Sequence, residues 1–134
     1  MGKKTNKFIY WTPRILSIIF ICFLALFSLD VISPGLSFWQ IAVGLFMHNI
    51  PVFILLAVLL ISWKHEIVGG IVFILAGLLY SALSIIRMIM SNPVEWYMLF
   101  WSLQIAGPAF FIGILFIINW RRKKHNHHKD ALIK

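Results

Sequence analysis

Hydrophobic residues occupy this chain in four long runs, each separated from the next by a short polar segment. Each run is long enough to cross a bilayer, because about twenty residues of α-helix span roughly 30 Å, the thickness of the hydrocarbon core. The pattern predicts transmembrane helices over about 13–32, 38–63, 67–90 and 96–120. We therefore expect an all-α membrane protein, an antiparallel four-helix transmembrane bundle. Residues 1–134 form a single four-span domain, in which 121–134 are a polar, basic cytoplasmic tail.

Signals for helix starts precede three of the runs. Thr12 is placed to cap the first. Ser37 followed by Gln40 is a capping-box pattern before the second, and Asn92 followed by Glu95 repeats that pattern before the fourth. Indole rings favour the headgroup region, and five of the six tryptophans fall at predicted span ends. These are Trp11, Trp39, Trp63, Trp96 and Trp120.

Composition excludes an ordinary soluble domain. The chain is 61% hydrophobic and 12% charged, whereas soluble domains are about 25% charged. Its net charge of +8 does not indicate a nucleic-acid site, because the basic residues flank the spans and form no basic face or groove. They instead predict attraction to anionic lipid headgroups at the cytoplasmic face of the bilayer.

The basic residues also predict orientation. Five of them fall on the side of the bilayer that holds the N-terminus, and the six that follow Trp120 fall on the same side. Arg87 alone falls on the other side. By the positive-inside rule both termini face the cytoplasm. The expected localisation is the cell (plasma or inner) membrane, with multiple passes.

Two prolines interrupt the spans near the predicted midplane. Pro51 and Pro108 each remove a helical hydrogen bond, which frees the carbonyls of Met47 and Gln104 and predicts a kink. Those carbonyls need another donor or a water in lipid. Because His48 and Asn49 lie beside Pro51, one interpretation of this segment is a kink whose neighbours satisfy its freed backbone groups.

A second interpretation is a cavity open to the outside. Ionisable groups at membrane depth are functional candidates, and polar residues of the spans are concentrated in the predicted outer half. The candidate pocket residues are His48, Asn49, Ser84, Arg87 and Gln104. Asn49 and Gln104 also fit interhelical hydrogen bonds, so both interpretations stay open for them.

Two further expectations concern packing. Arg87 is expected to pair with Asp30 or Glu95 and to order the outer face of the bundle. Small residues recur at helical spacing and predict close contact between helices. They are Gly70, Gly77 and Ser84 in the third span and Ala109 and Gly113 in the fourth.

Several kinds of chemistry have no counterpart in the sequence. No acidic residue falls inside a predicted span, which argues against an antiporter with a buried carboxylate. No phosphate-binding loop, catalytic triad or zinc motif is present. The histidines at 125, 127 and 128 are interpreted as part of a solvated tail. We therefore expect no metal, no cofactor and no enzymatic activity.

Three segments resemble those of small, uncharacterised prokaryotic four-span membrane proteins. They are WTPR at 11–14, MHNIP at 47–51, and the stretch from SWK at 62–64 to GG at 69–70. The resemblance implies a four-span fold and no particular activity. It also indicates that His48 and Pro51 are the first positions to mutate.

The sequence thus favours a non-enzymatic accessory, interaction or structural subunit of the membrane, acting as a homo-oligomer or with a membrane partner. The alternative is a small transporter or channel component, with an outward-facing polar pocket around His48. Convergence of His48, Gln104 and Ser84 on one space would favour the alternative, and dry contacts between helices would favour the first.

Overall fold

The computed structural model describes the backbone of residues 2–134 and the side chains from residue 7 onward. Four long helices and one short 3-10 helix are joined by turns and loops, and residues 2–134 contain no strand. They are α1 (Gly2–Phe27), η1 (Ser28–Val31), α2 (Phe38–Ser62), α3 (Glu66–Met90) and α4 (Tyr97–Ile133). All four long helices have the length and apolar character needed to cross a membrane. The predicted helical membrane bundle is therefore confirmed.

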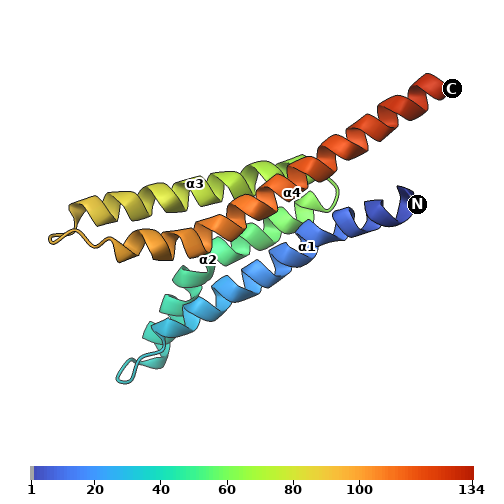
Figure 1. The fold of residues 1–134 in the computed structure, drawn as a ribbon. Helices are drawn as coiled ribbons and strands as arrows, with labels where there is room; N and C mark the ends of the chain where they lie inside the picture. The colour runs from blue at the N-terminus through green and yellow to red at the C-terminus, as the bar shows by residue number, and fades with distance from the viewer. Residues whose placement is uncertain (1) are drawn as a thin grey trace.

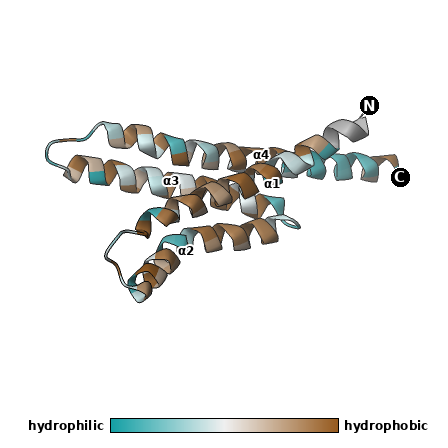
Figure 2. Ribbon diagram, turned by 90° about the horizontal axis from the view of Figure 1, so that it is seen from below, coloured by the Kyte–Doolittle hydropathy of each residue, from teal (hydrophilic) through white to brown (hydrophobic). Residues whose placement is uncertain are grey.

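The helices form two hairpins, α1–α2 and α3–α4 (Figure 1). Both chain termini and the α2–α3 turn lie at one end of the bundle, which we call the termini end. The loops at 32–37 and 91–96 lie at the other, the loop end (Figure 1). Figures 1 and 2 both show the α1–α2 hairpin diverging from α3–α4 towards the loop end. The bundle is thus closed at one end and splayed at the other.

Contact is most extensive between α3 and α4, and glycines make it possible. A Cβ built on Gly113 would lie 2.9 Å from the carbonyl oxygen of Gly70 and 2.6 Å from Cγ1 of Ile74. A Cβ on Gly77 would lie 3.0 Å from the ring of Phe110. Only glycine allows the backbones to approach this closely, so the predicted packing through small residues is confirmed at these positions.

An apolar core joins the hairpins across their middle. The ring of Phe73 on α3 stacks on that of Phe116 on α4, with centroids 6.1 Å apart, and Phe20 of α1 lies 6.4 Å from Phe73. Leu55 and Leu59 of α2 complete this core. Most other large apolar side chains are exposed on the outside of the bundle, where hydrophobic residues dominate the helices (Figure 2). That surface suits a lipid environment.

One predicted capping box is confirmed, and the two other predicted helix caps are corrected. The backbone N–H of Ser37 donates to Oε1 of Gln40 at 2.9 Å, and the N–H of Gln40 donates to Oγ of Ser37 at 3.4 Å. The prediction that Thr12 caps the first span is wrong, because α1 begins ten residues earlier at Gly2. Its hydroxyl instead donates to the carbonyl of Phe8 at 2.6 Å.

The predicted capping box of the fourth helix is also wrong, although its predicted start at about residue 96 agrees with the structure to within one residue. α4 begins at Tyr97, and Glu95 accepts a hydrogen bond from the Tyr97 hydroxyl at 2.6 Å instead of capping a helix with Asn92. The helix itself continues past the predicted end of the fourth span at residue 120, so the polar, basic residues 121–133 are helical. This segment contains no glycine or proline to end a helix. The resulting α4 exceeds the thickness of a bilayer, so its last turns extend beyond the membrane.

Candidate functional site

The structure distributes the predicted pocket residues over three separate cavities. His48 lines a cavity between the hairpins, Ser84 and Arg87 line a second one with Tyr97 of α4, and Gln104 lines a third between α1 and α4. Similar depth in the membrane does not place residues on the same helix face. Gln104 lies nine residues before Gly113, two and a half turns, and so on the side of α4 opposite the α3 contact.

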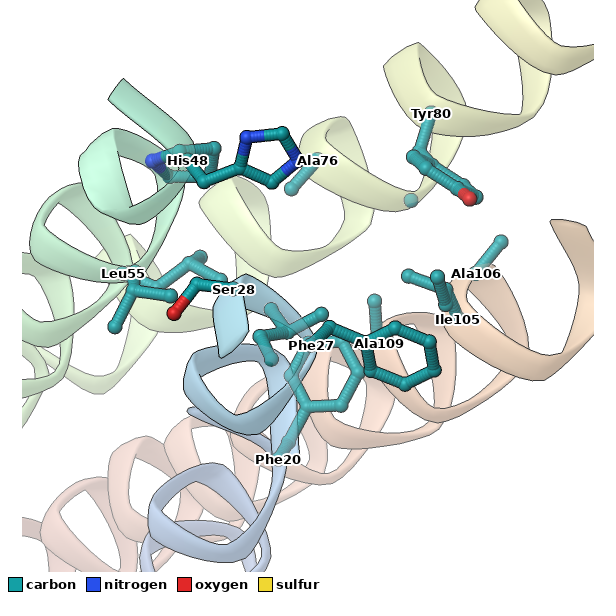
Figure 3. A pocket seen from close by; sticks show the side chains of 14 residues that line it. Phe20, Phe27, Ser28, His48, Leu55, Ala76, Tyr80, Ile105, Ala106 and Ala109 are labelled. Atoms are coloured by element: carbon teal, nitrogen blue, oxygen red, sulfur yellow. The ribbon is translucent and has the colours of Figure 1, made fainter. Parts of the chain in front are cut away.

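The cavity between the hairpins, called here the interhelical cavity, has a volume of about 330 Å³ and is bounded by all four long helices. Most of its lining is aliphatic or aromatic. Polar groups come from three side chains only, the hydroxyls of Ser28 and Tyr80 and the imidazole of His48. In Figure 3 the His48 side chain points from α2 towards α3. The remaining lining residues are Phe20, Leu24, Phe27, Pro51, Val52, Leu55, Ala76, Gly77, Ile105, Ala106 and Ala109.

This lining favours one class of ligand. The volume is within the range of small-molecule sites, about 300–1,000 Å³, which combine apolar walls with a few polar groups. Apolar cavities of protein remain dry and accept apolar molecules. A polar solute would lose its hydration here without enough partners to replace it. The cavity can therefore accept a mainly apolar molecule that carries one hydrogen-bonding group.

The proline segment of α2 helps to form this cavity. Pro51 lies inside α2, and the helix bends part-way along its length (Figure 2). Asn49 donates from Nδ2 to the carbonyl of Leu45 at 2.8 Å, so its side chain serves the backbone of its own helix. Within the described residues the ring of His48 makes no hydrogen bond. Of the polar residues in this segment, His48 is the one available to a ligand.

A second candidate site lies at the termini end and was missed by the sequence analysis. It consists of Arg14 of α1, Glu66 of α3 and Asn119 of α4, whose side chains are 0%, 2% and 8% exposed. An Nη of Arg14 lies 3.0 Å from Oε1 of Glu66, and Nδ2 of Asn119 donates to the same oxygen at 3.1 Å. We call these three residues the charge cluster. It joins three helices.

Aromatic rings and backbone groups surround the Arg14 guanidinium. It donates to the carbonyls of Tyr10 and Trp63, the latter at 3.3 Å. Its central carbon lies 3.6 Å from the centroid of the Tyr10 ring and 6.0 Å from that of Phe116. Such contacts with ring faces and carbonyls partly replace the water that a buried cation loses.

Among the described residues, two atoms of the charge cluster have no hydrogen-bond partner, Nε of Arg14 and Oε2 of Glu66. Lys123 on α4 brings a further positive charge, with its Nζ 4.0 Å from Oε1 of Glu66. A buried carboxylate oxygen without a donor is costly and marks a place where a ligand or water can bind.

The charge cluster changes the picture in two ways. Glu66, predicted to lie in the polar turn before the third span, is the first residue of α3 and is buried. Polar residues were expected to gather towards the loop end, where Ser28 and Ser102 are buried, but the buried charged residues lie at the termini end. One signal was present: Arg14 follows Trp11 by three residues, Glu66 follows Trp63 by three, and Asn119 directly precedes Trp120.

The expected ion pairs of Arg87 are not formed. Among residues 7–134 its guanidinium forms no salt bridge with a carboxylate, and the described ion pairs both involve Glu66. Asp30 lies exposed in η1 at the end of the α1–α2 hairpin, which diverges from the hairpin that carries Arg87. The separation of the hairpins at the loop end explains why that pair does not form.

Comparison with known proteins shows a family. A family model described as a domain of unknown function (DUF7670) matches residues 1–128, nearly the whole chain. No curated protein and no solved structure matches the chain. The chain belongs to this family, and with its four apolar helices it is a membrane protein of unknown function.

Proposed function

We propose that this DUF7670 protein is a non-enzymatic accessory protein of the membrane that holds a lipid-like, amphipathic molecule in the interhelical cavity. The observation that carries the proposal is the lining of that cavity. All four helices contribute apolar walls, and the polar groups are confined to Ser28, His48 and Tyr80.

Selectivity in such a site has to come from its polar groups and its shape. A lipid that moves from the bilayer into the cavity exchanges one apolar environment for another, so burial of its alkyl chain provides little net free energy. A hydrogen bond to His48 or Tyr80 has no water to compete with it at this depth. The ligand class is therefore a chain or ring system with a hydroxyl, carbonyl or carboxyl group.

A transporter or channel for a polar solute has less support. That alternative requires His48, Gln104 and Arg87 to face one hydrated space, whereas they line three cavities. The only extensively buried polar cluster lies at the other end of the described bundle.

Filling the interhelical cavity tests the proposal. Ala76→Phe on α3 places a ring where the ligand would lie, because Ala76 lines the cavity and packs against the core. We expect binding of an environment-sensitive fluorescent fatty acid to weaken about tenfold, equivalent to about 1.4 kcal/mol. The measurement is a fluorescence titration of the purified protein in detergent micelles.

The matched control is Ala82→Phe, on the same helix at an exposed position outside the cavity. It adds the same ring to the lipid-facing surface and should leave the fatty-acid affinity unchanged. Equal affinities for both variants, with both proteins folded by thermal unfolding, would show that the cavity is not the binding site.

We further propose that the protein sits in the cell membrane with both termini in the cytoplasm. The basic residues at 121–124 and Lys64 support this orientation, since all of them lie at the termini end. Green fluorescent protein and alkaline phosphatase fused in turn to each terminus should give fluorescence and no phosphatase activity at both. Phosphatase activity at either terminus would overturn the orientation.

A further inference from the structure

A small polar cavity lies over the charge cluster at the termini end, between α1 and α4. Its volume is about 180 Å³. Tyr10 lines it from α1 and Glu66 from α3, and the residues that α4 contributes include Asn119, Arg122 and Lys123. The interhelical cavity shares none of these residues. It is therefore a separate site, and the argument for it does not depend on the proposed function.

Charges of both signs face this polar cavity. Oε1 of Glu66 is already occupied by Arg14 and Asn119, whereas Oε2 of the same carboxylate is buried and has no donor among the side chains from residue 7 onward. Arg122 and Lys123 are exposed, and Nζ of Lys123 lies 4.0 Å from Oε1 of Glu66, so both side chains can place a positive charge near an anion in the cavity. A ligand that satisfies all of these groups has an N–H donor with positive charge next to an anionic group.

The cavity lined by Gln104 lies further along the same pair of helices and is called here the apolar crevice. Its volume is about 300 Å³, and apart from Gln104 its lining is apolar, with Leu16 of α1 and Pro108 and Phe111 of α4 among the lining residues. Pro108 and Phe111 precede Asn119 and Arg122 by eleven residues, about three helical turns, and so lie on the same face of α4. The polar cavity and the apolar crevice are thus arranged along α4 in the same order as the headgroup and the acyl chain of a lipid.

The level of the polar cavity agrees with this arrangement. Trp11 and Trp63 meet edge to face at the termini end, with centroids 6.0 Å apart, and Lys124 lies over the ring of Trp120. Tryptophan and basic residues together mark the headgroup region of a bilayer.

From these observations we infer that the α1–α4 face binds a phospholipid whose headgroup contains a phosphate esterified to an alcohol with a primary ammonium group. The ammonium donates to Oε2 of Glu66, the phosphate binds Arg122 and Lys123, and an acyl chain lies in the apolar crevice. This is a defined site, in contrast to a general attraction of basic residues to anionic membranes.

Native mass spectrometry of the full-length protein tests the inference. Phosphatidylethanolamine, phosphatidylcholine and phosphatidylglycerol with identical chains are titrated separately, and free phosphoethanolamine is added as a fourth ligand. We expect phosphatidylethanolamine to bind about tenfold more tightly than the other lipids. Phosphatidylcholine has no N–H to donate, and phosphatidylglycerol has no ammonium. Equal binding of the three lipids would overturn the headgroup assignment.

A pair of double variants separates the site from surface charge. Arg122→Gln with Lys123→Gln should weaken phosphatidylethanolamine binding about tenfold. Arg121→Gln with Lys124→Gln removes the same charge from positions on α4 that do not line the polar cavity and should leave affinity unchanged. Equal losses in both would reduce the effect to general electrostatics and overturn the site.

Two further arms complete the test. Free phosphoethanolamine that binds as tightly as the lipid would overturn the assignment to a membrane lipid. The Ala76→Phe variant should retain its preference for phosphatidylethanolamine, because Ala76 does not line the polar cavity and lies ten residues after Glu66 on α3, about 15 Å along the helix. Absence of fatty-acid binding to the interhelical cavity with the headgroup preference retained would thus overturn only the proposed function. Absence of the headgroup preference alone would overturn only this inference.

Discussion

Replacement of Glu66 by alanine is expected to lower the free energy of unfolding by about 3–5 kcal/mol, the usual cost of removing one partner of a buried ion pair. Arg14 is fully buried and has Glu66 as its only carboxylate partner among the described residues. Without that carboxylate the guanidinium stays buried and uncompensated, and Asn119 loses its acceptor. Equilibrium unfolding in mixed detergent micelles measures the change.

The control is Asp30→Ala, which removes an exposed carboxylate from η1. It should change stability by less than about 0.5 kcal/mol, as surface substitutions usually do. The double variant Arg14→Met with Glu66→Met should recover most of the stability lost by Glu66→Ala, because apolar replacement of a buried pair is often neutral. A loss below about 1 kcal/mol for Glu66→Ala would show that the cluster is hydrated and is not a structural tie.

The charge cluster gives the two ends of the bundle different properties. At the termini end it joins α1, α3 and α4 by hydrogen bonds to a single carboxylate oxygen. At the loop end the hairpins diverge, and the interhelical cavity lies between them. The polar contacts are thus concentrated at one end of the bundle and the interhelical cavity lies towards the other.

The sequence was sufficient to predict the helices because hydrophobic length is a local property. Four runs of membrane-spanning length predict four helices whatever their neighbours are. The Ser37–Gln40 capping box was predictable for the same reason, since its two hydrogen bonds join residues three apart. The end of α4 was not, because charged residues without glycine or proline are compatible with both helix and coil.

The charge cluster could not be predicted from local patterns. Arg14 and Glu66 each lie beside a tryptophan that marks a membrane border, and a charged residue at a border normally faces water. Their burial depends on which helix faces which, and they are 52 residues apart. The separation of His48 from Gln104 was unpredictable for the same reason. Position along a span gives the depth of a residue in the membrane, but it does not give the direction in which the side chain points around the helix.

The second large effect is expected at Gly113, where α4 crosses α3. Gly113→Ala places a methyl group 2.9 Å from the carbonyl oxygen of Gly70 and 3.1 Å from the backbone nitrogen of Ile74. Backbone atoms cannot move aside as a flexible side chain can, so the helices have to separate. We expect a loss of about 1–3 kcal/mol, typical of overpacking, measured by the same unfolding experiment.

Gly107→Ala is the matched control on the same helix. A Cβ at Gly107 meets nothing within 4 Å, so alanine should stabilise α4 by about 0.5–1 kcal/mol through its better helix propensity. Opposite signs for two chemically identical changes would attribute the loss at Gly113 to helix contact alone. Equal effects of Gly107→Ala and Gly113→Ala would contradict the close approach of α3 and α4.

Gly70→Ala provides a further test, because Gly70 faces Gly113 across the same contact. A Cβ there would lie 2.6 Å from Cγ1 of Ile117 and 3.2 Å from the carbonyl oxygen of Gly113. If one separation of the helices relieves both clashes, the double variant should lose less stability than the sum of the single losses. Strict additivity would mean that each methyl is accommodated locally, and that α3 and α4 keep their spacing.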